Sequence, residues 1–555
     1  MTTTLNLPEE TSDGRARRAA LSQLTAEAVT PTAVVGFVSR GRCLIIGDET
    51  RGRELGATLD VARFQPVVVV PGDQAPSVDA SSAAPLVRGG RLRVAGALGD
   101  FDATLTHGSE THDVGALLSP PVERFDLVVD LGTRPLLRQA MLPLGYYAPG
   151  EDPEALAEVV ATLPDMLGEF EKPQYFEYDA EICAHGRSGK RGCTRCIDAC
   201  PAAAIVSFGE RIEVNPYLCQ GGGACATSCP TGAITYAYPR AHDLLGLVHR
   251  GLASYRDAGG THAVVLYFDA ASSGPLSEGL VRQLPERVLP IEVEEVGSVG
   301  LDAWLVTLAY GADAVVLAAA DRTPVQAIET AQDQMLIGKT ILGGMGYDEQ
   351  RIRLINVDQP SEALSVLENL PAGTARRPAG FQSPPDKRGR LRIAIEHLYE
   401  QAPQSRRSVP LPEGAPFGEI RVDAKACTLC MGCVSVCPTH ALQDGRGLPQ
   451  LNFREWNCVQ CGLCERACPE DAITLSARFL YDVEARERSR TLHEEPPFCC
   501  VVCGKPFATR SMLDRVNRRL EGHWMFQTEQ ARRRLQMCET CRVKDVYASQ
   551  GSTGI

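Results

Sequence analysis

Cysteine is missing from one long central stretch of the sequence. The chain has 555 residues and 21 cysteines, and none of these lies between Cys229 and Cys427. Apart from Cys43, which stands in an apolar segment and is expected to be a buried core thiol, all of them fall into three dense groups. This clustering argues against a secreted disulfide framework and favours metal sites in a reducing compartment.

Long apolar runs are absent as well. No stretch of about 20 apolar residues occurs, so the sequence predicts no membrane span. Residues 1–14 are polar and acidic, and no hydrophobic run follows Arg17 and Arg18, which argues against a secretory or twin-arginine signal. We therefore expect a cytoplasmic protein. The net charge of −13 argues against a nucleic-acid partner, and the missing G-x-G-x-x-G spacing argues against a dinucleotide site.

Two cysteine runs carry the strongest positive signal. Residues 427–438 and 458–469 both read Cys-x2-Cys-x2-Cys-x3-Cys-Pro, the spacing with which bacterial ferredoxins bind cubane clusters. In that arrangement the fourth cysteine of each run crosses to the other cluster. The sequence therefore predicts two four-iron sites, named site III (Cys427, Cys430, Cys433 and Cys468) and site IV (Cys437, Cys458, Cys461 and Cys464). Zinc frameworks use two cysteine pairs, so two quartets argue against zinc here.

A degraded copy of this pattern lies upstream and suggests an internal duplication. It predicts site I (Cys183, Cys193, Cys196 and Cys229) and site II (Cys200, Cys219 and Cys225). In site II, Gly222 stands where the second cysteine of the run belongs, so one iron corner lacks its thiolate. We expect there a three-iron cluster, a four-iron cluster with an outside ligand, or an empty site.

Site I differs from the ferredoxin spacing by an insert, AHGRSGKRG, between Cys183 and Cys193. The insert carries three cations, Arg187, Lys190 and Arg191. It is interpreted either as a solvated loop or as a basic loop that raises a nearby cluster's potential or meets an acidic partner. His185 could serve as a ligand, but with Cys183 close by we expect it to be a bystander.

The last cysteine group has the spacing of a structural zinc site. Two Cys-x2-Cys pairs, Cys500 with Cys503 and Cys538 with Cys541, are typical of zinc knuckles, and a rubredoxin-like iron is the alternative. Cys499 is expected to be a spectator. The gap between the pairs predicts a helix around residues 510–523. Residues 501–545 are basic, which favours docking of an acidic partner or packing on the chain's own acidic surface.

The fold class predicted is α/β plus α+β. Two α/β parallel-sheet domains are expected to be interleaved with two bacterial 2[4Fe–4S] ferredoxin-like modules and followed by a zinc-ribbon-like tail. The expected ranges are 1–170 (an α/β domain without an assigned role), 171–240 (degenerate dicluster module), 241–375 (flavodoxin-like domain without cysteine), 376–416 (linker with a helix), 417–480 (dicluster module), 481–498 (charged linker) and 499–545 (zinc-knuckle tail).

Three segments carry a family resemblance. They are CAHGRSGKRGCTRCIDACP, EVEEVGSVGLDAWLVTLAYGADAVVL, and the terminal CGKPFATRSMLDRV, GHWMFQ and RLQMCETCRVKD. Through them, residues 170–545 resemble the bacterial multi-ferredoxin proteins that accompany molybdenum or tungsten formate dehydrogenases. The resemblance implies a redox protein partner, a formate dehydrogenase. The middle domain is also similar to the delta subunit of some hydrogenases and heterodisulfide reductases, but it lacks that subunit's cluster cysteines, which implies a scaffold or docking role.

These observations predict a multi-cluster electron-transfer protein. Its expected cofactors are three [4Fe–4S] clusters, one [3Fe–4S] or incompletely ligated [4Fe–4S] cluster, and one zinc ion. No acid–base or nucleophile constellation stands out, so we expect a non-catalytic component of an oxidoreductase system. Two alternatives remain: a maturation factor for a partner metalloenzyme, and a self-contained flavin or nicotinamide oxidoreductase.

Overall fold

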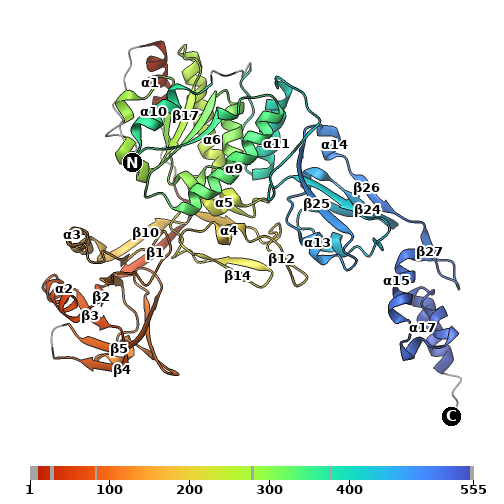
Figure 1. Cartoon of the computed structure of the whole chain (residues 1–555), viewed down its shortest axis with the longest axis horizontal. Coiled ribbons are helices and arrows are strands. Elements are labelled where there is room, and N and C mark those ends of the chain that lie inside the picture. Colours follow the sequence, from red (N-terminus) through yellow and green to blue (C-terminus); the bar gives the residue numbers. More distant parts are fainter. Residues whose placement is uncertain are drawn as a thin grey trace.

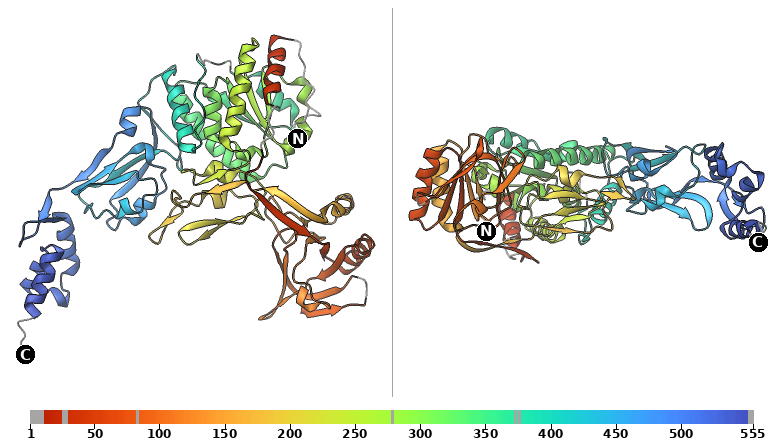
Figure 2. Two further views of the ribbon diagram at one scale, coloured as in Figure 1. Left: turned by 180° about the vertical axis from the view of Figure 1, so that it is seen from behind. Right: turned by 90° about the horizontal axis from the view of Figure 1, so that it is seen from below.

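The computed structural model describes residues 11–24, 30–81, 84–276, 280–371, 373 and 377–550. An N-terminal sheet domain and a C-terminal tail lie at opposite ends of an elongated arrangement, with the middle domain and two small modules between them (Figure 1). The view from below keeps the same end-to-end order (Figure 2). Within the described part of the chain, no helix combines the length and the apolar character needed to cross a bilayer.

The N-terminal domain is built on an eight-stranded sheet of order β7-β6-β5-β3-β2-β8-β9, with β4 beside β5. Its strands are β2 (Arg42–Ile46), β3 (Gln65–Val70), β4 (Gly72–Asp79), β5 (Leu86–Ala95), β6 (Asp102–His107), β7 (Glu110–Asp113), β8 (Leu127–Asp130) and β9 (Tyr146–Tyr147). Its helices are α2 (Glu49–Val61), η1 (Gly115–Leu117), α3 (Pro153–Thr162) and η2 (Leu163–Met166).

The predicted parallel sheet for this domain is wrong in part. β2 is parallel to β3 and β8, with α2 as the crossover, but β5, β6 and β7 form an antiparallel meander. The turns that join these three strands are short, and short turns allow antiparallel pairing but leave no room for a crossover helix.

An antiparallel ribbon connects the sheet domain to the rest of the protein. β1 (Val34–Ser39) leads into the domain and β10 (Gly168–Pro173) leads out of it, paired from Val34 with Pro173 to Ser39 with Gly168. β1 pairs with β10 alone and is separate from the domain's eight-stranded sheet. The chain therefore enters and leaves the sheet domain at one place.

The middle domain contains a parallel sheet of order β18-β17-β19-β20. Its strands are β17 (Val264–Phe268), β18 (Val288–Glu292), β19 (Ala314–Ala319) and β20 (Ile352–Asn356). Its helices are α6 (Ala241–Asp257), α7 (Ala270–Pro275), η4 (Val281–Gln283), η5 (Val296–Ser298), α8 (Leu301–Ala309), α9 (Val325–Gly344), η6 (Glu349–Arg351) and α10 (Pro360–Glu368). β17 and β19 are buried along their full length, as apolar strands covered on both faces should be.

Two further helices belong to the middle domain, contrary to the predicted boundaries. α1 (Ser12–Leu24), expected in the N-terminal domain, packs on α6 because Ala16 and Ala20 are buried there and Asp13 accepts a hydrogen bond from Tyr255 (3.0 Å). α11 (Lys387–Glu400), expected in a linker, packs on α8 with Leu391, Ala394, Ile395 and Leu398 buried.

The two small modules share one plan: two short helices, a hairpin between them (β14–β15 or β23–β24), and an antiparallel pair of strands that flank them (β11–β16 or β22–β25). The first contains β11 (Phe176–Tyr178), β12 (Gly186–Arg187), β13 (Lys190–Arg191), α4 (Arg195–Asp198), β14 (Ile205–Phe208), β15 (Arg211–Val214), α5 (Ala224–Ser228) and β16 (Ile234–Tyr236). The second contains β21 (Ser408–Pro410), β22 (Gly418–Val422), α12 (Gly432–Ser435), β23 (Leu442–Gly445), β24 (Leu448–Phe453), η7 (Glu455–Asn457), α13 (Leu463–Ala467), β25 (Ile473–Leu480), α14 (Val483–Glu487) and β26 (Arg490–Glu494).

The segment expected to be a charged linker, 481–498, is part of the second module. β26 pairs antiparallel with β24, and Arg490 forms ion pairs there with Glu419 and Glu455. The tail follows as a hairpin and helices: β27 (Pro497–Cys499), β28 (Pro506–Thr509), α15 (Arg510–Leu520), η8 (Trp524–Phe526), α16 (Glu529–Arg534) and α17 (Glu539–Gln550). α15 lies where the helix was predicted.

Candidate metal centres

The fold brings the cysteines of each predicted site together. Every site contains one deeply placed cysteine whose pKa is raised first by burial and then by the other thiols of its own site: Cys196 in site I, Cys225 in site II, Cys433 in site III and Cys464 in site IV. Cys229 therefore lies near the other cysteines of site I, and Cys200 near those of site II. Cys468 and Cys437 lie near those of sites III and IV in the same way.

Crowded, buried thiols fit a metal group by their chemistry. Burial and like charge both oppose ionisation, and they raise the pKa of Cys433 to about 12. Thiolates are nevertheless the form that binds iron, and the irons supply the positive charge that makes ionisation favourable. Four soft donors in sites I, III and IV, and three in site II, therefore suit iron–sulfur clusters.

In sites II, III and IV, the loop around the second position of the cysteine run has one shared backbone shape. The residues before and after Cys430 have positive φ angles of 53° and 59°, and those around Cys461 have 53° and 78°. Gly222 is flanked by Gly221 and Gly223, with φ angles of 80° and 72°. Site II thus keeps the backbone of a ligand loop, although the ligand side chain itself is missing.

A second local feature recurs after the Cys-Pro pairs. The backbone N–H four residues later donates to the cysteine sulfur in three places: Ala204 to Cys200 (3.3 Å), Ala441 to Cys437 (3.2 Å) and Ala472 to Cys468 (3.3 Å). Such bonds favour the thiolate. Beside Cys229 the corresponding N–H, of Ala233, donates to Thr231 Oγ1 instead (3.1 Å). Cys-Pro-x-x-Ala occurs in all four runs and is the sequence signal from which this turn could have been predicted.

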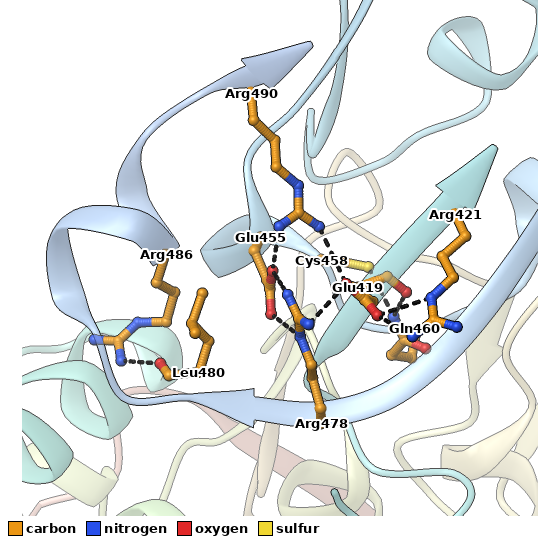
Figure 3. A network of polar contacts seen from close by, with 9 residues as sticks. All are labelled: Glu419, Arg421, Glu455, Cys458, Gln460, Arg478, Leu480, Arg486 and Arg490. Atoms are coloured by element: carbon orange, nitrogen blue, oxygen red, sulfur yellow. Dashed lines mark hydrogen bonds and ion pairs between the residues drawn. The ribbon is translucent and has the colours of Figure 1, made fainter. Parts of the chain in front are cut away.

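A polar network holds the loop that precedes Cys458 (Figure 3). Arg478 makes two hydrogen bonds to buried Glu455 (2.8 and 2.7 Å) and an ion pair with Glu419 (2.7 Å). Gln460 Nε2 donates to Cys458 Sγ and to the Glu419 carbonyl, both at 3.3 Å. Glu455 starts η7, which ends directly before Cys458, so this network positions the first ligand of site IV.

Two adjacent residues of α11 reach the two modules. Lys387 is buried and donates to the carbonyls of Ala226 and Thr227 at the end of α5. Arg388 donates to the carbonyls of Pro416 and Trp456, and burial lowers its pKa to about 10. The helix expected to be a linker therefore connects both modules to the middle domain.

The insert of site I is a docking element. β12 and β13 form a hairpin whose turn residues, Ser188 and Gly189, both have positive φ. After β13, the carbonyls of Arg191 and Gly192 accept hydrogen bonds from Arg466 on α13 (2.5 and 3.1 Å). The interpretation as a solvated loop fits the tip of the hairpin, whereas the base of the hairpin contacts the second module. His185 is engaged through both ring nitrogens, with Cys193 O and Ser207 Oγ, as expected for a bystander.

The four tail cysteines are also close together. Ligand atoms of Cys500, Cys503, Cys538 and Cys541 all lie within 4.8 Å of one another, and the Cys503 and Cys538 sulfurs are 3.7 Å apart. A tetrahedral ion with metal–sulfur bonds of about 2.3 Å has edges of about 3.8 Å, so this set fits zinc. Cys499 is outside the set and exposed, and Cys43 is fully buried in β2, where burial raises its pKa to about 12.

Comparison with known proteins is consistent with this geometry. Residues 415–473 and residues 190–233 each match a family model described as a 4Fe-4S dicluster domain. The chain is similar to "Ferredoxin-type protein NapF" of Escherichia coli (strain K12), with 46% identity over 55 residues, which are 9% of this chain and 34% of the relative. It is similar to "Ferredoxin-1" of Caulobacter vibrioides, with 44% identity over 50 residues, 9% of this chain and 42% of the relative.

The chain spans about a third to two fifths of the length of these curated relatives. Both modules match family models of dicluster domains, although the first has seven cysteines where the second has eight. The chain is an iron–sulfur protein with two ferredoxin-type 4Fe-4S domains.

Proposed function

We propose that the protein is an electron relay in which the four cysteine sites form one path, in the order II, I, IV, III. Sites I, III and IV would hold [4Fe–4S] clusters, and site II a further cluster. Within each module the crossing cysteine follows, by one or two residues, the helix that carries a cysteine of the neighbouring site, so paired sites are close by construction. The step between the modules is the one that needs separate evidence.

The contact between the insert and α13 carries this proposal. Arg466 holds the backbone of residues 191 and 192, directly before Cys193 of site I. Gly192 is packed so closely that a Cβ atom there would lie 2.8 Å from Leu463 Cγ. Burial is the main reason that the pKa of Cys193 is raised to about 11, and the thiols of Cys229 and Cys461 raise it further. Site I and site IV are therefore neighbours.

The outer end of the relay is site III. Cys430 is exposed, and the tail packs against the same loop, where Thr509 Oγ1 donates to the Thr428 carbonyl (3.1 Å) and Arg515 pairs with Glu470 (2.5 Å). Residues 501–545 contain ten Lys or Arg and five Asp or Glu in a chain of net charge −13. This supports an acidic redox protein as the partner that meets site III, because opposite charge steers such encounters.

A formate dehydrogenase is the partner that we propose, on the strength of the resemblance of residues 170–545 to multi-ferredoxin proteins that accompany such enzymes. We also propose that Cys500, Cys503, Cys538 and Cys541 bind one structural zinc ion, which stabilises the tail beside site III. The tetrahedral spacing of the sulfurs supports this assignment.

The relay is tested at the junction between the modules. Arg466→Glu places a carboxylate against two carbonyl oxygens and should separate site I from site IV, whereas Glu465→Gln, at the exposed neighbouring position of α13, is the matched control. Both variants should bind as much iron as the parent protein after anaerobic reconstitution. In Arg466→Glu, the magnetic interaction between clusters in the fully reduced protein should weaken, and electrons supplied by a photoreductant should reach site IV more slowly. Unchanged coupling would refute the proposed order.

A further inference from the structure

The N-terminal sheet domain, to which the sequence assigns no role, reaches site II. Met141 lies in the segment between β8 and β9, and its backbone N–H donates to the Pro201 carbonyl (3.0 Å), next to the ligand Cys200. A Cβ atom on Gly222 would lie 3.1 Å from Met141 Sδ and 3.0 Å from Pro201 Cγ. A thioether sulfur is thus beside the position from which the missing thiolate of site II would project.

The segment that presents Met141 is fixed by a buried carboxylate. Asp130, at the end of β8, accepts hydrogen bonds from Tyr146 Oη (2.5 Å) and from the Leu136 backbone N–H (2.9 Å). The Tyr146 hydroxyl in turn accepts from the Leu137 backbone N–H (3.3 Å). The position of Met141 is therefore part of the folded domain rather than a chance approach of a free loop.

The ribbon that leads out of this domain also reaches site II. Lys172 on β10 donates to the carbonyls of Cys219 (2.6 Å) and Tyr217 (3.0 Å), and its ammonium is 5.1 Å from the centre of the Phe37 ring on β1. The middle domain also contacts the first module beside site II, because Thr227 Oγ1 on α5 donates to the Gly297 carbonyl (3.1 Å). Site II is enclosed by two domains outside its own module.

We propose that Met141 supplies the fourth donor of site II, so that the N-terminal domain completes a four-iron site that the first module leaves one ligand short. This proposal rests on the proposed function, in which site II holds a cluster. A thioether is a soft donor of the type that iron–sulfur clusters accept. It is neutral where a thiolate is negative, and Lys172 adds positive charge, so site II should have the highest reduction potential of the four sites.

Substitution of Met141 tests the proposal. Met141→Leu removes the sulfur at nearly constant volume, and Met166→Leu, in the same domain, is the matched control. Parent and control proteins should reconstitute to about sixteen irons and show no signal when oxidised, whereas Met141→Leu should lose about one iron and show a three-iron signal near g of about 2.01. Met141→Cys should keep the four-iron site and lower its potential, because it adds a negative thiolate.

The outcomes separate this proposal from the relay itself. A three-iron signal in the parent protein that is unchanged in Met141→Leu would overturn the role of Met141. The role would also be overturned if the parent protein and Met141→Leu both bound about sixteen irons and showed no signal when oxidised. A parent protein that stops near about twelve irons would mean that site II is empty, which overturns this proposal and leaves sites I, III and IV in place. Failure of all sites to take up iron would overturn the proposed function instead.

Discussion

Loss of Arg478 should release iron selectively from site IV. Its guanidinium lies between two carboxylates whose side chains are 5% and 11% exposed, those of Glu455 and Glu419 (Figure 3). Removing one partner of a buried ion pair costs about 3–5 kcal/mol, because the remaining charge is left without compensation. Arg490 still lies 3.2 Å from Glu455 and 3.6 Å from Glu419, so we expect Arg478→Met to lie at the lower end, about 3 kcal/mol.

The lost free energy should make the loop before Cys458 open more often. About 3 kcal/mol corresponds to a population of the open loop roughly a hundredfold higher. When opening and closing are fast, the rate at which a chelator removes iron follows that population. The rate for site IV should therefore rise about a hundredfold under anaerobic conditions, while the slower phases from the other sites stay unchanged.

Arg421→Met is the matched control, since Arg421 pairs with the same Glu419 but its side chain is 72% exposed. An exposed ion pair contributes about 1 kcal/mol or less, so iron release should change no more than about fivefold. Adding Glu455→Gln to Arg478→Met should recover much of the loss by removing the unpaired charge. Equal release rates in Arg478→Met and Arg421→Met would refute the reasoning.

Three further expectations concern the tail, the middle domain and turnover. Cys503→Ser should abolish zinc binding and make the tail sensitive to protease without changing the iron content, whereas Cys499→Ser should do neither; loss of cluster absorbance in Cys503→Ser would contradict the zinc assignment. Burial, Asp269 and Glu294 raise the pKa of Glu295 from 4.5 to about 7, so the folded state binds the extra proton and stability falls as pH rises between these values. Glu295→Gln should remove this decline, so it should raise the unfolding temperature more at pH 8 than at pH 5. The gain in the free energy of unfolding should be about 3 kcal/mol at most. An equal effect at both pH values would contradict the raised pKa of Glu295. The isolated protein should accept electrons from dithionite but should not turn over formate, NAD or quinone, and robust formate oxidation by the isolated chain would contradict the relay.

The cysteine groups of sites III and IV could be predicted from sequence because three cysteines of each site come from one short loop. Their spacing records the geometry directly, as in the runs that begin at Cys427 and Cys458. The middle-domain strands were predictable for a similar reason, since their buried apolar runs are continuous. Zinc, the cluster count and the partner stay predictions.

Contacts between distant segments leave no such record. Three contacts depend on residues that are far apart in the chain: that of Met141 with Gly222, the hydrogen bonds from Lys387 to α5, and the packing of α1 on α6. The insert before Cys193 was recognised as unusual, but its docking on α13 follows from the three-dimensional relation of two modules. Charge content was a poor guide as well. Residues 481–498 were predicted to be a linker because they are highly charged, but Arg490 of this segment forms ion pairs with Glu419 and Glu455.

The ribbon of β1 and β10 has a consequence for how such a protein can be assembled from parts. Ser39 faces Gly168 across the ribbon, so a tight turn between them would close the chain and leave out the whole sheet domain. Insertion at such a point is tolerated because both ends of the added domain meet. A shortened chain of this kind would keep Lys172 and every cysteine of the four sites, but it would lose Met141. The pairing of β1 with β10 therefore allows the sheet domain to be removed as one piece, and the proposed contact of Met141 with site II would be lost with it.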